Sequence, residues 1–169
     1  LTEGLEVIRR NVELEARLID DLLDLTRISK GKLQLNFDTV DVHAICQSAM
    51  DICSVDVIGK KLSTTLDLAA RRKHVRGDPA RLQQVLWNLI KNAIKFTPDG
   101  GQIVIESADS PADGRLTVRV TDTGIGIDPA ELPRIFDAFE QGQRSITRRF
   151  GGLGLGLAIS KTIVELHGG

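Results

Sequence analysis

The sequence begins with about 30 residues that show helical periodicity on two adjoining sides. No proline interrupts this stretch, and Gly31 stands where a residue in the left-handed conformation would end the helix. A helix that buries two sides needs other helices around it, and the sequence offers no second helix of matching length. We therefore expect a helical bundle whose other members lie elsewhere. One apolar stripe comprises Leu5, Ile8, Val12, Ile19 and Leu22, and the other comprises Leu14, Leu18, Leu25 and Ile28.

After this helix, apolar residues alternate with polar ones over residues 33–37, as in a half-buried strand. The change marks a domain boundary, so that residues 1–31 form a bundle helix and residues 32–169 form a second domain. Mixed helices and strands there predict an α/β sandwich, with a mixed sheet in one layer and helices in the other. The predicted helices are 42–58, 79–95, 128–136 and 154–167. The predicted strands are 62–68, 102–107 and 115–122. We also expect residues 71–76 to form a basic hairpin tip and residues 140–152 to form a mobile, lid-like loop.

The composition excludes several classes of function. With 22 Lys+Arg against 23 Asp+Glu, the net charge of -1 gives no reason to expect binding to nucleic acid or to an anionic membrane surface. The longest apolar stretches fall far short of the roughly 18 residues that a membrane span needs. Cys46 and Cys53 lie about 10 Å apart along a predicted helix, which is too far for a disulfide, so we expect two core thiols. The histidines are scattered, which argues against a zinc site.

Three polar residues share one face of the helix predicted at 79–95. Asn92 follows Asn88 by four positions and Lys95 follows Asn92 by three, so all three project from the same side. Carboxamide oxygens suit a hard cation and an ammonium group suits a phosphate, a combination that fits a magnesium nucleotide. On spacing alone, a solvent-facing side of a half-buried helix explains the trio equally well.

A carboxylate and two glycines follow the strand predicted at 115–122. Asp122 ends the strand, and Gly124 and Gly126 come directly after it. This spacing lets the backbone turn tightly and approach a flat ligand, while the carboxylate can accept a hydrogen bond from an exocyclic amine. Taken alone, a simple strand-ending turn is the commoner explanation.

A run of glycines precedes the last predicted helix, at positions 152, 154 and 156. Free backbone amides and the positive end of the helix dipole favour anions at such a place. The spacing fits neither the P-loop nor the dinucleotide-binding fingerprint, so neither of those folds is supported. Phe136 and Phe139 lie just before the lid-like loop, and we expect them to be small core anchors that pin its near end.

Four motifs follow one another between residues 88 and 160: Asn-Leu-Ile-Lys-Asn-Ala-Ile-Lys-Phe-Thr-Pro, Asp-Thr-Gly-Ile-Gly-Ile, Phe-Asp-Ala-Phe and Gly-Gly-Leu-Gly-Leu-Gly-Leu-Ala-Ile. In order and spacing they resemble the N box, first glycine box, F box and second glycine box of bacterial sensor histidine kinases. Residues 1–35 resemble the second helix of that family's dimerisation and histidine-phosphotransfer hairpin. The resemblance implies a Bergerat ATP-binding fold preceded by a bundle helix.

The resemblance also implies that the chain binds ATP and Mg²⁺. By position, Asn92 would coordinate Mg²⁺ with Asn88 as a candidate second ligand, Lys95 would contact phosphate, and Asp122 would bind the adenine amino group. Leu153 stands where many relatives have threonine, so only a backbone contact is expected there. The nucleotide-binding residues implied beside Asp122 are Gly124, Gly126, Ile127, Phe136, Phe139, Gly152, Leu153, Gly154, Leu155 and Gly156.

Asn88 bears on the reaction as well. In related ATPases such as type II topoisomerases and heat-shock chaperones, a glutamate at this place activates water, and an amide cannot act as a general base. The resemblance therefore implies an ATP-dependent protein histidine kinase of two-component signal transduction, whose acceptor histidine lies upstream of Leu1. The alternatives are an ATPase or serine kinase of the same fold, and a catalytically silent dimerisation or docking module.

The same resemblance implies partners and a location. We expect a homodimer formed through the helical hairpin and a response-regulator receiver domain as partner. This chain should contact neither nucleic acid nor membrane and should be cytoplasmic, whether or not the parent protein has a membrane anchor. Because the sequence starts without Met and the family continues with two strands after Gly169, we expect a piece of a longer protein that lacks its last strands.

Overall fold

The computed structural model describes residues 2–110, 112–139 and 154–169, and within the first helix it describes the side chains of residues 12, 15, 16 and 18–29. The elements, in chain order, are α1 (Thr2–Ser29), β1 (Asp38–Asp41), α2 (Val42–Gly59), β2 (Ser63–Leu68), β3 (His74–Gly77), α3 (Pro79–Phe96), β4 (Gln102–Asp109), β5 (Leu116–Asp122), the 3₁₀ helix η1 (Leu132–Arg134) and α5 (Gly156–Leu166).

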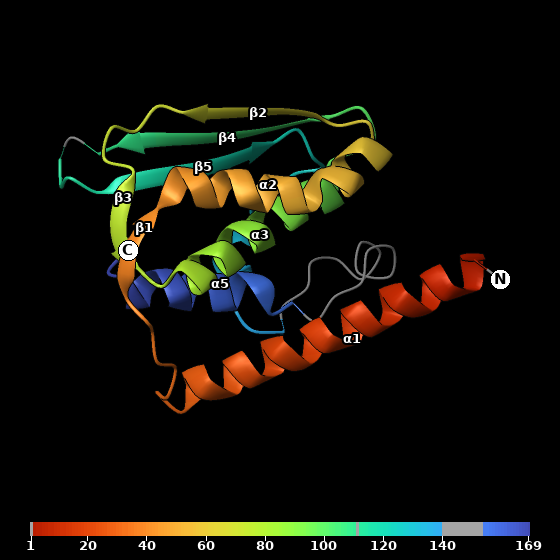
Figure 1. Ribbon diagram of the computed structural model, residues 1–169, viewed down its shortest axis with the longest axis horizontal. Coiled ribbons are helices and arrows are strands. Elements are labelled where there is room, and N and C mark those ends of the chain that lie inside the picture. Colours follow the sequence, from red (N-terminus) through yellow and green to blue (C-terminus); the bar gives the residue numbers. More distant parts are fainter. Residues whose placement is uncertain (1, 111, 140–153) are drawn as a thin grey trace.

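A mixed three-stranded sheet forms one layer of the molecule. Its order is β2-β4-β5, with β2 parallel to β4 and β4 antiparallel to β5. The helices α2 and α3 pack against each other beneath this sheet, and α5 lies on the far side of α3 (Figure 1). A separate antiparallel pair, β1 with β3, stands at one end of the layers. This arrangement confirms the predicted α/β sandwich.

The main core lies between the sheet and the two helices below it. Alternation along β4 directs Ile103 and Ile105 toward the helices, and both side chains are fully buried. Cys46 and Cys53 are also fully buried on α2 and form no disulfide, which confirms the prediction of two core thiols. Burial raises the pKa of the Cys46 thiol to about 11, so this thiol is protonated at neutral pH.

A second, smaller core joins α5 to α3 and to the C-terminal part of α1. Leu25 and Ile28 of α1 pack against its buried residues. Beside them, the carboxylate of Asp24 is almost fully buried and accepts hydrogen bonds from Arg81, at 2.5 Å, and from Gln84, at 3.0 Å. The end of α1 is therefore held on α3 by both apolar and charged contacts. The buried residues of this core are Val85, Leu155, Ile159 and Ile163.

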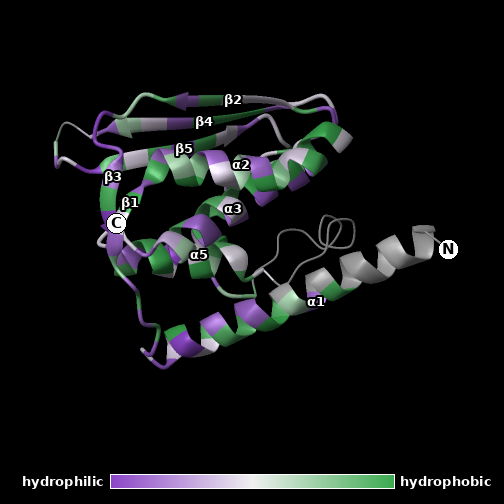
Figure 2. Cartoon of the chain, in the orientation of Figure 1, coloured by the Kyte–Doolittle hydropathy of each residue, from purple (hydrophilic) through white to green (hydrophobic). Residues whose placement is uncertain are grey.

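The helix α1 ends where the sequence predicts. Gly31 adopts φ +61, and its N–H donates to the carbonyl of Ile28 at 2.9 Å. Among the side chains of α1 that the structure describes, four apolar ones are exposed, and Figure 2 shows green segments along the coloured part of this helix. Within the described part of the chain, no helix is both long and apolar enough to cross a membrane. The exposed apolar residues are Val12, Ile19, Leu22 and Leu23.

The strand predicted at 33–37 is wrong. Residues 32–37 form no strand, and pairing with β3 begins only at Asp38. The N–H of Asn36 donates instead to the carboxylate of Asp78 at 2.9 Å, so the segment is tied to the start of α3 rather than to a neighbouring strand. The alternation nevertheless reflects packing, because Leu33 and Leu35 are half-buried.

The hairpin tip predicted at 71–76 is also wrong. Since β2 pairs with β4 and β3 pairs with β1, this stretch crosses from one sheet to the other. The backbone N–H groups of Arg71 and Arg72 donate to the Asp109 carboxylate at 2.8 and 3.1 Å and fix the crossing. These two hydrogen bonds hold the pKa of Asp109 below its usual value.

The helix predicted at 128–136 is reduced to the short 3₁₀ helix η1, flanked by turns. Pro133 lies within the stretch and has no N–H to donate, which prevents a continuous α-helix. The predicted lid-like loop, residues 140–152, lies outside the described residues.

Candidate functional site

The start of α3 is fixed by a cap. Pro79 opens the helix, and the carboxylate of Asp78 accepts the N–H groups of Ala80 and Arg81 at 3.1 and 3.2 Å. Burial alone would raise the pKa of Asp78, but these hydrogen bonds and the one from Asn36 together hold it below its usual value. The fixed start sets the rotation of α3 and so the direction of its polar face.

Asn88 is buried on that face, with 7% of its surface exposed. Its amide nitrogen donates to the carbonyl of Gly156 and the hydroxyl of Ser160, both at 3.3 Å. A Cβ on Gly156 would lie 3.5 Å from the Asn88 amide, in ordinary van der Waals contact, so the first turn of α5 lies directly against this side chain. Asn88 thus holds the first turn of α5 against α3, and the solvent-facing alternative is wrong for this residue.

Asn92 and Lys95 lie about one and two turns beyond Asn88, near the C-terminal end of α3. Both are half-buried. The ammonium of Lys95 lies 4.9 Å from the centroid of the Phe96 ring, and desolvation lowers its pKa. This end of the helix therefore offers a carboxamide and a cation side by side.

The turn after β5 packs against the same end of α3. The carboxylate of Asp122 accepts the N–H of Gly124 at 2.8 Å, and the N–H of Ile125 donates to the carbonyl of Phe96 at 3.2 Å. A Cβ at Gly124 would lie 2.5 Å from Asp122 Oδ1 and 2.8 Å from Phe96 O, so only glycine fits. Gly126 adopts φ +71 in open space. The motif at residues 88–98 and the motif at residues 122–127, about 30 residues apart in the sequence, are thus joined by this backbone hydrogen bond.

Four exposed apolar side chains follow this turn along the chain. Ile125, Ile127, Phe136 and Phe139 are 54%, 50%, 44% and 59% exposed. The prediction that Phe136 and Phe139 are core anchors is therefore wrong. The ammonium of Lys161 lies 5.7 Å from the centroid of the Phe136 ring, which links Phe136 to α5. Exposed isoleucines within a few residues of the exposed Asp122 carboxylate suit a flat ring that carries an amine.

The glycine-rich segment is described from Gly154 onward. Gly154 adopts φ +70, Leu155 is buried in the smaller core, and α5 begins at Gly156. The amide end of α5 therefore lies beside Asn88 on the polar face of α3, where its dipole favours an anion. Gly152 and Leu153 lie outside the described residues.

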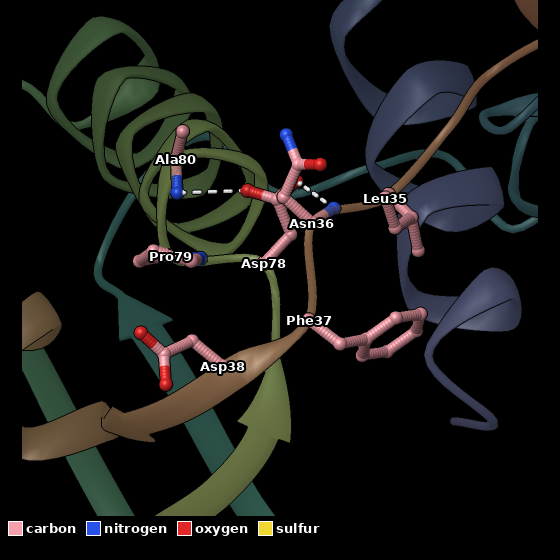
Figure 3. Close-up of a pocket in the computed structure, with 7 residues that line it drawn as sticks. All are labelled: Leu35, Asn36, Phe37, Asp38, Asp78, Pro79 and Ala80. Carbon is pink, nitrogen blue, oxygen red and sulfur yellow. Dashed lines mark hydrogen bonds between the residues drawn. The ribbon is translucent and has the colours of Figure 1, made fainter.

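An open depression of about 610 Å³ lies at the opposite end of α3, between the segment 35–38 and residues 78–80 (Figure 3). Figure 3 shows the Asp78 side chain between the backbones of Asn36 and Ala80, both of which donate to it. At 1.5 Å per residue, Asn92 is about 18 Å further along the helix from Ala80. The depression is therefore separate from the site formed by the motifs.

Two of the histidines join separate elements of the fold. The Nε2 atom of His167 accepts the N–H of Asp78 at 2.9 Å, and its Nδ1 donates to the carbonyl of Ile163 at 2.7 Å. His43 Nε2 lies 2.8 Å from the hydroxyl of Ser107. His167 therefore joins the C-terminal end of α5 to the start of α3, a contact that no local sequence signal indicates.

Comparison with known proteins identifies the region that carries this site. The family described as "Histidine kinase-, DNA gyrase B-, and HSP90-like ATPase" matches residues 77–169. This range covers α3, β4, β5 and α5, and so every residue of the candidate site.

Individual relatives match almost the whole chain. The signal transduction histidine-protein kinase BarA of Escherichia coli K12 is 37% identical, over 99% of this chain and 18% of its own length. The circadian input-output histidine kinase CikA of Synechococcus elongatus is 36% identical, over 99% of this chain and 22% of its own length. The structure of full-length ShkA in complex with AMPPNP superposes with a TM-score of 0.74 at 29% identity, over 88% of this chain and 30% of ShkA. The chain thus spans about a fifth of the length of these two curated relatives.

Proposed function

Because this chain belongs to the family of histidine kinase-, DNA gyrase B- and HSP90-like ATPases, we propose that it binds ATP with Mg²⁺ and transfers the γ-phosphoryl group to a histidine. Its relatives over nearly the whole chain are histidine kinases. The acceptor would be a histidine on the partner helix of α1, in a dimerisation hairpin. We assign residues 1–31 to that hairpin and residues 32–169 to the ATP-binding domain.

The observation that carries the proposal is the hydrogen bond between Ile125 N–H and the Phe96 carbonyl. It places the Asp122 turn on the helix end that bears Asn92 and Lys95. An adenine-binding carboxylate and a phosphate-binding face must lie on one side of the molecule to hold one nucleotide, and this contact supports that placement.

Different residues of the site bind different parts of the nucleotide. The exposed carboxylate of Asp122 accepts a hydrogen bond from the adenine amino group, and the apolar side chains of Ile127 and Phe136 cover the ring. Lys95 contacts phosphate as a cation, and the amide end of α5, from Gly154 to Gly156, faces the same phosphates. Partial burial of Lys95 strengthens its attraction for phosphate, because the screening by water is smaller.

A magnesium ion fits this donor set. Mg²⁺ takes oxygen ligands, and the carboxamide oxygen of Asn92 at the rim of the site is of the right kind. Asn88 is a weaker candidate, because its amide nitrogen is already held by Gly156 and Ser160 and only its carbonyl oxygen could turn to a cation. When bound, Mg²⁺ would neutralise phosphate charge.

Transfer is favoured over hydrolysis by the residue at position 88. A buried amide cannot take a proton from water, and Asn88 is fixed by two hydrogen bonds. The chemistry at this site is then to position ATP and stabilise its charge while a separate nucleophile attacks in line.

The exposed face of α1 supports the proposed dimer. Val12, Ile19 and Leu22 are 58%, 58% and 43% exposed and recur at helical spacing. We assign this face to the helical hairpin and its dimer, and we propose a response-regulator receiver domain as the partner that accepts the phosphoryl group next. Because ATP and response-regulator receiver domains are found in the cytoplasm, we propose that this part of the protein lies there too.

A labelling experiment tests the function. The chain is incubated with γ-labelled ATP, alone and with a dimeric hairpin that carries the upstream helix and its histidine. We expect no label on the chain and acid-labile, base-stable label on the hairpin. Stable label on serine or threonine of the chain would replace the proposal with a serine kinase. Rapid phosphate release without label would indicate an ATPase, and no ATP binding would indicate a silent docking module.

A further inference from the structure

Lys60 lies between α2 and β2, and its backbone is fixed on both sides. Its N–H donates to the carbonyl of Asp56 at 3.1 Å, and its carbonyl accepts the N–H of Gly100 at 2.9 Å. The next residue, Lys61, adopts φ +53 and turns the chain into β2. The side chain of Lys60 therefore starts from a well-defined point.

The ammonium group of Lys60 caps the C-terminal end of α3. It donates to the carbonyls of Ile94 at 2.6 Å, Thr97 at 2.7 Å and Lys95 at 3.2 Å. An ammonium group has three N–H donors, and these bonds use all of them. The last carbonyls of a helix have no partner within it and carry the negative end of its dipole, so a part-buried cation there stabilises the helix end.

The carbonyl of Phe96 lies between those that Lys60 contacts, and it accepts the N–H of Ile125. A Cβ on Gly124 would lie 2.8 Å from the same oxygen, so the turn also touches it sterically. The direction of this carbonyl, together with the hydrogen bond from Thr123 N–H to the carbonyl of Gln102 at 3.0 Å, sets where the turn after β5 lies. Lys60 helps to hold that direction through the peptide groups on either side, at Lys95 and Thr97, beside the hydrogen bonds that Thr97 donates to the carbonyl of Ala93.

We propose that Lys60 is a positioning residue for nucleotide binding, whose ammonium fixes the end of α3 and thereby places the Asp122 turn against the helix face that bears Asn92. The assignment rests on the proposed function, because it concerns the geometry of the same site. Lys60 needs no contact with the nucleotide to act in this way. It precedes the four motifs in the sequence, and its role depends on carbonyl groups more than 30 residues away.

A purely structural role for Lys60 would be to join α2 to α3. Lys91 provides the control for that role, because its ammonium forms an ion pair with Asp56 and joins the same two helices near the same end. The Lys91–Asp56 pair touches none of the carbonyls at the end of α3. Lys91→Met therefore removes a link between the helices and leaves the helix end capped, whereas Lys60→Met removes the cap.

The first measurement needs no nucleotide. Amide hydrogen exchange of Ile125 reports the hydrogen bond to Phe96 directly. We expect Lys60→Met to speed this exchange by about tenfold or more relative to amides of the β4–β5 pairing, and Lys91→Met to change it by less than about twofold. Lys60→Arg keeps a cation with several donors and should restore most of the protection.

The second measurement is ATP affinity and transfer at a temperature where circular dichroism shows each variant folded. We expect Lys60→Met to weaken ATP binding by about tenfold, because even a small displacement of the Asp122 turn from the α3 face that bears Asn92 lowers affinity. We expect Lys91→Met to bind ATP as tightly as the wild type does. Adenosine, which contacts only one half of the site, should lose less affinity than ATP. A merely structural lysine would lower the melting temperature and leave this difference between ATP and adenosine unchanged.

Each outcome decides the proposal. If wild-type chain binds no ATP, the proposed function fails, while the exchange of Ile125 still shows whether Lys60 places the turn. Unchanged exchange at Ile125 in Lys60→Met overturns the positioning role, as does equal loss of ATP and adenosine affinity. If Lys60→Met does not fold, Lys60→Gln replaces it with a neutral donor. Failure of both to fold would make Lys60 a folding determinant and overturn the proposal.

Discussion

Gly124→Ala is the sharpest perturbation of the candidate site, because the structure leaves no room for a methyl group there. The new Cβ would lie 2.5 Å from Asp122 Oδ1 and 2.8 Å from Phe96 O. The carboxylate can rotate away, but Phe96 O is backbone at the end of a helix and can move only if the turn moves. The substitution should therefore break two hydrogen bonds, from Gly124 N–H to Asp122 and from Ile125 N–H to Phe96.

The expected loss follows from those two bonds. Each is worth about 0.5–1.5 kcal/mol net, so holding the turn in its binding shape becomes less favourable by about 1–3 kcal/mol. If ATP binding requires that shape, the dissociation constant should rise roughly 5- to 150-fold. Calorimetric titration with ATP measures this rise, and circular dichroism measures the melting temperature of the same samples.

Gly31→Ala is the matched control. Gly31 has φ +61 and nothing within 4 Å of an added Cβ, so alanine there costs about 1–2 kcal/mol of backbone strain without a clash. It lies between α1 and β1, far from the site, and should leave ATP affinity unchanged. A folded Gly124→Ala chain that binds ATP as tightly as the wild type would refute the role assigned to the turn.

Three further results are expected. Asn92→Ala should remove the dependence of ATP binding on Mg²⁺ in calorimetry, because it deletes the proposed oxygen ligand; an unchanged Mg²⁺ response would contradict the assignment. Asp122→Asn should weaken ATP more than GTP, by about 1–3 kcal/mol, because an amide can present a donor to the adenine amine; an unaltered preference between the two would remove Asp122 from the base pocket. The hydrogen bond from Lys73 holds the pKa of Asp41 below its ordinary 3.8, so this carboxylate stabilises the fold above that pH and the contribution is lost as pH falls through the lowered value. At about pH 7 the wild type should therefore melt at a higher temperature than Asp41→Asn, and at about pH 3 the two melting temperatures should lie closer together. A difference that stays the same at both pH values would exclude this contribution.

Local signals in the sequence predict most helices well. Asp78 followed by Pro79 is a typical cap and first helical residue, and α3 begins there. Asp41 caps α2 in the same way, through the N–H groups of His43 and Ala44. These features need only neighbours within one turn, so they can be recognised before the fold is known.

What the sequence could not indicate depends on distant partners. The strand β3 is four residues long and has its partner, β1, more than 30 residues earlier, so no short pattern reveals it. Asn88 looks like a surface residue by periodicity, and its burial follows from Gly156, which lies 68 positions away. The exposure of Phe136 could not be predicted either, because phenylalanines, such as Phe136 and Phe139 three positions apart, usually lie in a core.

The parallel pairing of β2 with β4 has a consequence for how fast the chain folds. Partners such as Ser63 and Gln102 lie about 40 residues apart, with all of α3 between them, so this pairing requires closure of a long loop. The β4–β5 hairpin closes over a few residues and can form early. We therefore expect α3 and the hairpin to structure first and β2 to join late, so that a substitution in β2 would mainly speed unfolding while one in α3 would slow folding.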